Sequence, residues 1–239
     1  MNDLIQNLRE TLEPLPYIYA LWLEGSYANG TADEYSDIDI WIDFEDEFEE
    51  QAIEAVENVL PELDYKYKSP HGHPKIRQRT YHLAGTSEYF MIDVCWQLHS
   101  REDVYYYEND NVESVKVIFD KVNIIKYKPL EVPDFTLQLE KAKHHRTQYN
   151  RVQKYIKRGQ YLESYAYYNH YVLEPLIVLL RLIYTPAYPD YYLIHISRHI
   201  PDNERIQLEY FAQISSIADI ETKIPQAGAW FDELVKIYF

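Results

Sequence analysis

The sequence predicts two parts, an α+β first half and an all-α second half. Short segments with alternating apolar residues, typical of half-buried strands, recur between residues 17 and 127. From about residue 136 onward the apolar residues recur every three or four positions, as they do in amphipathic helices. The prolines of "KPLEVPDF" separate the two patterns. We therefore expect one domain over residues 1–130 and a second over residues 131–239.

In the first half, the expected helices and strands are mixed along the chain. Leucines at helical spacing predict a helix over residues 3–14, which two prolines end. A second helix is expected over residues 47–60. The expected strands are 17–23, 37–44, 63–68, 75–83, 88–98, 115–120 and 123–127. The segments 75–83 and 88–98 flank the turn "AGTS", so we expect them to pair as a hairpin.

In the second half, apolar spacing predicts a bundle of helices. The expected helices are 136–158, 161–184, 189–199, 203–215 and 219–237. A proline at position 175 removes one backbone donor, so we expect it to kink or restart the helix that contains it. The chain has 25 tyrosines, and many of those in this half fall at helical spacing. We expect most of them to fill the bundle, while some are candidates to line an acceptor pocket.

Composition limits the classes of function. The 239-residue chain carries a formal net charge of −16, which is poorly suited to binding a long nucleic acid. The charge would attract a cationic partner, or it only keeps the protein soluble. The longest apolar stretch, "YVLEPLIVLLRLIY", is interrupted by charge and proline, so we expect no membrane span. The N-terminus has no signal-peptide pattern, and the single cysteine, Cys95, excludes a disulfide framework. A cytoplasmic protein is the simplest interpretation.

The segment "GSYANGTADEYSDIDIWIDF" (25–44) contains the clearest chemical signal. Because side chains alternate along a strand, Asp37 and Asp39 project from the same face. Two neighbouring carboxylates repel one another, and a hard cation such as Mg²⁺, which prefers oxygen ligands, relieves that repulsion. Upstream, Gly25 allows a close backbone approach and Ser26 offers a hydroxyl to an anion. Together these residues indicate a site for a triphosphate and a metal ion.

The Gly-Ser pair, followed about ten residues later by Ser-Asp-Ile-Asp at 36–39, resembles the signature of the nucleotidyltransferases of the DNA polymerase β superfamily. The Ser-Asp-Ile-Asp motif is typical of the minimal and aminoglycoside adenylyltransferase-like branch of this superfamily. The resemblance implies a mixed sheet flanked by helices, followed by a helical bundle. It also implies a third carboxylate on a later strand, for which Asp93 in "EYFMIDVCWQ" is the candidate. Asp43 shares the face of Asp37 and Asp39 but lies farther along, so we interpret it as structural.

The resemblance assigns roles to these residues. Asp37, Asp39 and Asp93 are expected to bind Mg²⁺, and Asp93 is also a candidate to remove the acceptor's proton. Gly25 and Ser26 are expected to hold the outer phosphates of a nucleoside triphosphate, most simply ATP. In some antibiotic-modifying relatives a glutamate of the helical domain is the base, and Glu163 and Glu174 lie in the corresponding half, although the sequence does not align them.

A basic segment in the second half provides one further candidate. "KAKHHRTQYNRVQKYIKR" (141–158) carries seven lysines and arginines and no acidic residue. Arg151, Lys154 and Arg158 are spaced three and four apart and share one side of a helix. They either face the nucleotide, with Lys154 as the first choice, or form a solvated face or a patch paired with acidic groups.

The acceptor has three candidate classes. The acidic balance and the long second half favour a hydroxyl of a small cationic molecule such as an aminoglycoside. A hydroxyl of a partner protein, as in antitoxin-type adenylyltransferases, is the alternative, although such proteins are usually much shorter. The third interpretation is a catalytically inactive nucleotide-binding module, against which the presence of all three carboxylates counts. The fold alone does not choose among them, because one fold hosts many acceptors.

Overall fold

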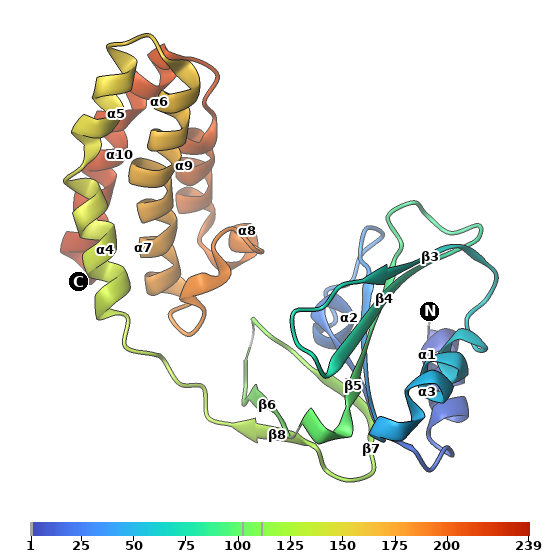
Figure 1. Ribbon diagram of the computed structural model, residues 1–239. Coiled ribbons are helices and arrows are strands. Elements are labelled where there is room, and N and C mark those ends of the chain that lie inside the picture. The colour runs from blue at the N-terminus through green and yellow to red at the C-terminus, as the bar shows by residue number, and fades with distance from the viewer. Residues whose placement is uncertain (1, 102, 111) are drawn as a thin grey trace. The chain divides into compact units, whose positions relative to one another are not determined.

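A six-stranded mixed sheet organises the first part of the chain (Figure 1). The computed structural model describes residues 2–101, 103–110 and 112–239, and these form two units, Met1–Leu130 and Glu131–Phe239. The strand order is β3-β4-β5-β2-β1-β7, and every neighbouring pair is antiparallel except β2 and β5, which are parallel. The strands are β1 (Ile18–Glu24), β2 (Ile38–Phe44), β3 (Leu63–Ser69), β4 (Ile76–Leu83), β5 (Ile92–Leu98) and β7 (Lys116–Asp120).

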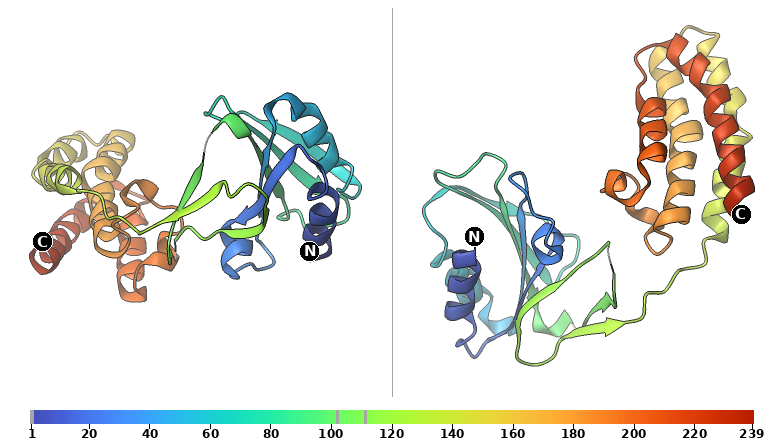
Figure 2. Two further views of the ribbon diagram at one scale, coloured as in Figure 1. Left: turned by 90° about the horizontal axis from the view of Figure 1, so that it is seen from below. Right: turned by 180° about the vertical axis from the view of Figure 1, so that it is seen from behind.

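Two helices, α1 (Asn2–Leu12) and α3 (Glu49–Glu57), cover one face of this sheet (Figures 1 and 2). Their apolar stripes pack on alternate residues of the strands, because side chains of one strand point to opposite faces. The buried residues contributed by the central strands are Ile38, Ile40, Ile42, Phe44, Ile92, Val94 and Trp96. The intervening residues of β2 and β5 therefore lie on the other face, away from α1 and α3.

A short parallel ribbon of β6 (Val104–Tyr107) and β8 (Ile125–Lys128) contributes a small separate core. Buried side chains of β1, Ala20 and Trp22, pack in this core with Tyr106. The sequence analysis expected β8 but missed β6. Its four residues, "VYYY", show no alternation between apolar and polar side chains, so no period-two pattern marks them as a strand.

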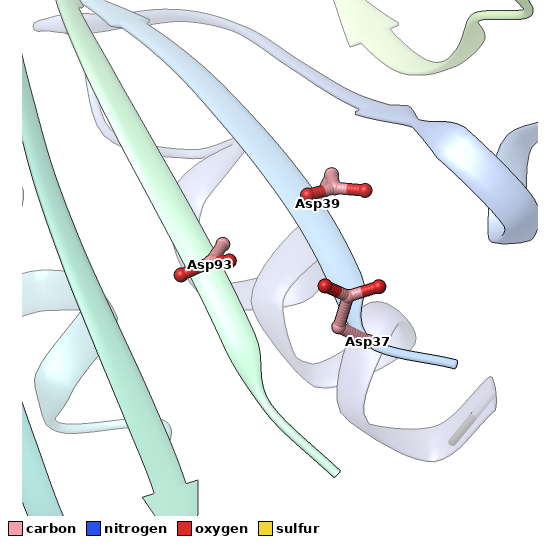
Figure 3. A group of neighbouring side chains, drawn as sticks. All are labelled: Asp37, Asp39 and Asp93. Carbon is pink, nitrogen blue, oxygen red and sulfur yellow. The ribbon is translucent and has the colours of Figure 1, made fainter. Parts of the chain in front are cut away.

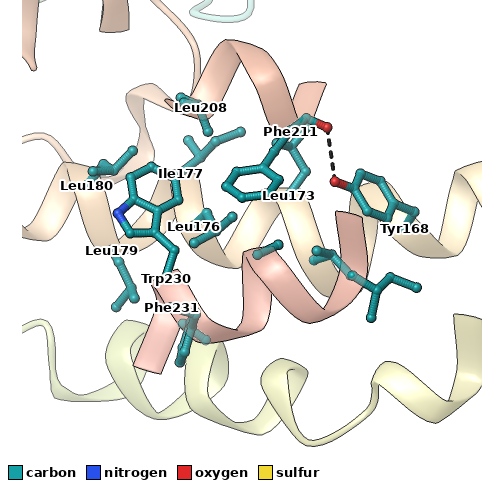
Figure 4. Packing of buried hydrophobic residues seen from close by; sticks show 14 of the residues in the cluster. Tyr168, Leu173, Leu176, Ile177, Leu179, Leu180, Leu208, Phe211, Trp230 and Phe231 are labelled. Carbon is teal, nitrogen blue, oxygen red and sulfur yellow. Dashed lines mark hydrogen bonds between the residues drawn. The ribbon is translucent and has the colours of Figure 1, made fainter. Parts of the chain in front are cut away.

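The second unit is a helical bundle (Figures 1 and 4). Tyr168 is fully buried there, and its hydroxyl donates a hydrogen bond of 3.0 Å to the backbone carbonyl of Phe211. The core also contains Trp230 and Phe231, which pack on the apolar face of the helix 174–184. The helices are α4 (Thr136–Arg146), α5 (Tyr149–Ile156), α6 (Tyr161–Tyr168), α7 (Glu174–Tyr184), α8 (Ile196–His199), α9 (Asp202–Ala212) and α10 (Ile217–Tyr238). The predicted fold class, α+β followed by an all-α part, is confirmed.

Two of the expected helices differ from the structure. The expected helix 136–158 is divided into α4 and α5 by a turn at Thr147 and Gln148, whose backbone N–H groups donate to the carbonyls three residues earlier, of His144 at 3.0 Å and of His145 at 2.9 Å. The expected helix 189–199 is interrupted in its middle. A 3₁₀ turn (Pro189–Tyr191) and α8 (Ile196–His199) form its two ends, whereas residues 192–195 are not helical, because Tyr192 and His195 have φ of 47° and 53°, which a helix does not accommodate.

Pro175 does not restart its helix. The backbone stays right-handed helical from α6 through a π-helical turn (Asn169–Leu173) into α7, with the proline one residue after that turn. The wider turn is the local change that accompanies the missing backbone donor.

Candidate active site

Three carboxylates converge on the face of the sheet that α1 and α3 leave free (Figure 3). The parallel pairing of β2 with β5 sets Asp39 directly beside Asp93, and Asp37 precedes Asp39 by two residues. One oxygen from each of the three side chains lies within 4.8 Å of the others. The structure thus brings together the three aspartates that the sequence singled out.

The three carboxylates bring like charges close together, which affects their protonation. Asp37 is exposed, whereas Asp39 and Asp93 are half-buried. Burial, followed by the negative charges of Asp37, Asp93 and Glu24, raises the pKa of Asp39 to about 7. A divalent cation would relieve this repulsion, and three carboxylates within this distance are the oxygen donors that Mg²⁺ prefers. The residues present therefore fit such an ion.

Gly25 lies against this cluster and cannot readily be another residue. Its φ is +65°, in the left-handed region that favours glycine, and a Cβ built there would overlap the Asp39 carboxylate. Gly25 is also the first residue of the short helix α2 (Gly25–Asn29), which directly follows β1. The turn therefore depends on glycine for its backbone conformation and for the room that Asp39 occupies.

Ser26 presents an unpaired hydroxyl beside this turn. Its Oγ is buried and has no hydrogen-bond partner among the described residues. A buried hydroxyl that lacks a partner costs free energy, commonly about 1–3 kcal/mol. A ligand that accepts a hydrogen bond from Ser26 would recover this cost. A phosphate oxygen is a suitable acceptor for this donor.

A second set of polar side chains supports the carboxylates. Thr80, on β4, donates its hydroxyl hydrogen bond to Asp93. Glu24, the backbone partner of Asp39 on β1, accepts a hydrogen bond from the Tyr106 hydroxyl. That hydroxyl in turn accepts one from Trp22 Nε1 at 2.6 Å. These contacts fix the orientation of two acidic groups at the site.

Sequence reasoning missed these supporting residues for different reasons. Glu24 immediately precedes the Gly-Ser pair, so the sequence could have indicated that its carboxylate lies near the site. Thr80 becomes relevant only through the register of the hairpin β4–β5, in which it lies opposite Asp93. Nothing in the sequence marks Tyr106, which reaches Glu24 from the separate ribbon.

Asp43 is placed as the sequence analysis interpreted it, in a structural position. Its fully buried carboxylate accepts hydrogen bonds of 2.7 Å from Gln97 Nε2 and pairs at 2.7 Å with His99 Nδ1. It does not belong to the metal-compatible group of three.

Cys95 lies on β5 two residues after Asp93, but it has the wrong protonation state for a nucleophile. Burial and the charges of Glu24, Asp93 and Asp39 raise its pKa to about 12. The thiol is therefore neutral at physiological pH, and the chemistry of this site rests on oxygen groups.

Lys154 lies in α5 of the second unit. Its side chain is exposed, with Nζ at 5.5 Å from the centroid of the Tyr155 ring, and Arg158 lies over the same ring at 5.6 Å. Arg151 is exposed as well. The predicted contact of Lys154 with a nucleotide stays a prediction.

A match to a known protein family lies within the first unit. Residues 5–108 match the family model described as a nucleotidyltransferase domain, and this range contains every predicted site residue of the first unit. No curated protein matches the chain. Among the described residues, no helix is both long enough and apolar enough to cross a membrane.

Two solved structures are similar to this chain at low identity. One is an aminoglycoside 6-adenyltransferase from Bacillus subtilis, with 13% identity, a TM-score of 0.36, and coverage of 100% of this chain and 91% of that one. The other is a spectinomycin adenyltransferase from Enterococcus faecialis with ATP and spectinomycin, with 10% identity, a TM-score of 0.31, and 99% coverage of both chains. Both TM-scores lie below 0.5.

Replacing Gly25 separates two physical costs. Gly25→Ala should lower the free energy of unfolding by about 1–3 kcal/mol, because alanine is strained at this φ, and should additionally displace the Asp39 carboxylate. The matched control is Gly30→Ala, at φ +78° with no atom near the added Cβ, which pays only the backbone cost. Denaturant unfolding of both variants measures the difference. Equal losses for both would show that Asp39 does not constrain Gly25.

The raised pKa of Asp39 predicts a defined pH dependence in the absence of metal. Because the folded state holds this proton up to about pH 7 and the unfolded state releases it near the ordinary aspartate pKa, the wild type loses stability as pH rises through that window. Asp39→Asn does not titrate, so its stability relative to wild type should increase from about pH 4 to pH 7 and then remain constant. Thermal melts in chelator across this range test the expectation, and a difference that is independent of pH contradicts it.

Proposed function

We propose that this protein is a Mg²⁺-dependent adenylyltransferase, because residues 5–108 match the model of a nucleotidyltransferase domain. The reaction moves AMP from ATP to a hydroxyl of a small, cationic acceptor such as an aminoglycoside-like molecule and releases pyrophosphate. The observation that carries the proposal is the convergence of Asp37, Asp39 and Asp93, from β2 and β5, beside the Gly25–Ser26 turn.

In this proposal, the turn after β1 holds the outer phosphates of ATP. The buried Ser26 hydroxyl would donate to a phosphate oxygen and thereby gain the partner that it lacks among the described residues. Gly25 supports the role because it has no side chain to obstruct the approach of the phosphates or the position of Asp39.

The three aspartates would hold the metal, which supplies charge stabilisation for transfer at phosphorus. Asp93 would also remove the acceptor's proton, a role supported by the hydrogen bond from Thr80, which engages one of its oxygens and leaves the other without this contact. The acceptor oxygen forms a bond with the α-phosphorus, and the bond from that phosphorus to the bridging oxygen of the pyrophosphate breaks. The proton passes to Asp93, and pyrophosphate leaves with the bonding electron pair.

Charge supports a cationic acceptor. The chain has a net charge of −16, and Glu24 adds a further carboxylate beside Asp39. A positively charged acceptor would be attracted to such a site, whereas an anionic one would be repelled.

Replacing single carboxylates tests the proposed chemistry. Asp39→Asn and Asp93→Asn should each lower transfer at least about a hundredfold, because each removes charge that acts on the transition state, while the fold is retained. Glu54→Gln removes one charge from the exposed side of α3, the helix that covers the opposite face of the sheet, and should leave transfer unchanged. Transfer of radiolabel from α-labelled ATP to a panel of aminoglycosides measures this.

The same assay includes total cell protein as a second acceptor class. Label on a protein and not on any aminoglycoside would favour the protein adenylyltransferase alternative. No transfer to either class, with ATP still bound, would favour an inactive nucleotide-binding module.

For Lys154, the proposal is a contact with the triphosphate. Lys154→Ala should weaken ATP binding by about 1.5–3 kcal/mol, the range for hydrogen bonds to charged groups, and should weaken AMP binding much less. Lys157→Ala, an exposed lysine three residues along, serves as the matched control. Calorimetric titrations with both nucleotides at two salt concentrations distinguish a direct contact from general charge, since general charge affects both and fades with salt. Equal losses of affinity for ATP and AMP would indicate that Lys154 lies on a solvated face and does not contact the triphosphate.

A further inference from the structure

The face of the sheet that carries the carboxylates continues beyond Asp93 onto two further strands. In the antiparallel registers, Asp93 on β5 lies opposite Thr80 on β4, and Thr80 lies opposite Tyr67 on β3. Opposed residues project to the same face, and adjacent strands are about 4.8 Å apart, so Tyr67 is roughly 10 Å from Asp93 along this row. That separation is comparable to the length of a small ring system whose hydroxyl reaches Asp93.

The row ends at Tyr67, and Tyr65 lies two residues before it on the same face of β3. Tyr67 is 60% exposed and Tyr65 is 48% exposed, although both are large and partly apolar. Tyr65 is held in place: its ring stacks on His82 with centroids 5.2 Å apart and planes 6° apart, and its hydroxyl donates to Met91 Sδ at 3.1 Å. Tyr65 and Tyr67 together are called the β3 platform below.

The direction of the proposed reaction selects which substrate lies over the β3 platform. At the transferred phosphorus, the attacking and leaving oxygens are roughly in line. The pyrophosphate is proposed to leave on the side of Gly25 and Ser26, which follow β1. Across the sheet, β1 is followed by β2, β5, β4 and β3 in that order. The attacking hydroxyl therefore comes from the opposite side, over β5, with the body of the acceptor over β4 and β3.

The charges of β3 and β4 are segregated between the two faces in a way that suits a cation. Their basic residues, Lys66, Lys68, Arg77 and Arg79, alternate with the residues of the Asp93 row and so point to the face that α3 covers. Two of them, Lys66 and Arg79, pair there with Glu57 of α3. On the carboxylate face, the same strands present Gln78, Thr80, His82 and the β3 platform, with no lysine or arginine. An ammonium group above a tyrosine ring is attracted by the ring's electrons and meets no lysine or arginine of these strands.

We propose that the β3 platform is the acceptor subsite and that Tyr67 stacks on a hydroxylated ring that bears an ammonium group. Thr80 and Gln78 offer hydrogen bonds between the platform and Asp93, where the reacting hydroxyl lies. Tyr67 is thus a specificity-determining residue for the acceptor. This inference rests on the proposed function, because that function fixes the side from which the acceptor attacks.

The test compares Tyr67→Leu with Tyr67→Phe, using kanamycin and spectinomycin as probes. Leucine removes the ring and phenylalanine keeps it, and both suit an exposed position on an edge strand. Lys68→Ala changes the next residue of β3, which points to the other face, and is the matched control. Binding is titrated by calorimetry with Mg²⁺ and the non-transferable analogue α,β-methylene-ATP present, and KM values are measured for the acceptor and for ATP.

Tyr67→Leu should weaken binding of a probe, and raise its KM, by about three- to thirtyfold, the range expected for a cation above an aromatic ring. Tyr67→Phe and Lys68→Ala should remain within about twofold of wild type, and the KM for ATP should not change in any variant. An effect of Tyr67→Leu on ATP alone would assign the platform to the nucleobase and overturn the inference, as would unchanged values for both substrates.

The binding titration separates this inference from the proposed function. If the wild-type protein binds a probe through Tyr67 but transfers no AMP to it, the proposed function is contradicted, whereas the subsite is supported. Wild-type protein that binds neither probe would overturn the subsite, even if transfer to another kind of acceptor is found.

Discussion

The parallel pairing of β2 with β5 is the constraint on which the site depends, because it forces like charges together. Asp39 and Asp93 are register partners, so neither can move away without breaking the ladder. The register itself is fixed from the other face, where Ile40 and Val94 are fully buried against α1 and α3. A slip by one residue would bury the aspartates and expose the isoleucines and valine, at a large cost in free energy. The hydrophobic core thus holds a charge cluster that would otherwise disperse.

Several features of the first unit follow from that imposed cluster. The Asp39 carboxylate takes up the space beside Gly25, which leaves no room for a side chain there. Its pKa rises because burial and three neighbouring carboxylates act in the same direction. Thr80 and Tyr106 satisfy part of the hydrogen-bonding capacity of Asp93 and Glu24, but they carry no positive charge to the cluster. The repulsion between these carboxylates lowers the stability of the metal-free protein. A bound cation would relieve the repulsion, so the site costs stability that binding restores.

Much of this arrangement could be predicted from the sequence, because its signals are local. The two-residue period of "DIDIWIDF" places Asp37 and Asp39 on one face, and the apolar neighbours of Asp93 mark it as a charge on a buried strand. The parallel contact between β2 and β5 is not local, since α3, β3 and β4 lie between them in the chain. The ribbon strand β6 has no alternation, and the break after α4 is a change of two backbone hydrogen bonds to three-residue spacing, at Thr147 and Gln148. Such features depend on tertiary contacts or single hydrogen bonds, which periodicity does not report.

The order of strands across the sheet has a consequence for how the proposed substrates would be distinguished. The nucleotide's phosphates would lie at β1, the metal ligands are on β2 and β5, and the acceptor would lie over β4 and β3. Tyr65 and Tyr67 are on the edge strand β3, are largely exposed, and contribute little to the core. Substitutions there cost little stability, whereas the register of β2 with β5 tolerates almost none. Acceptor preference could therefore change at the edge of the sheet while the carboxylates and the phosphate turn stay fixed.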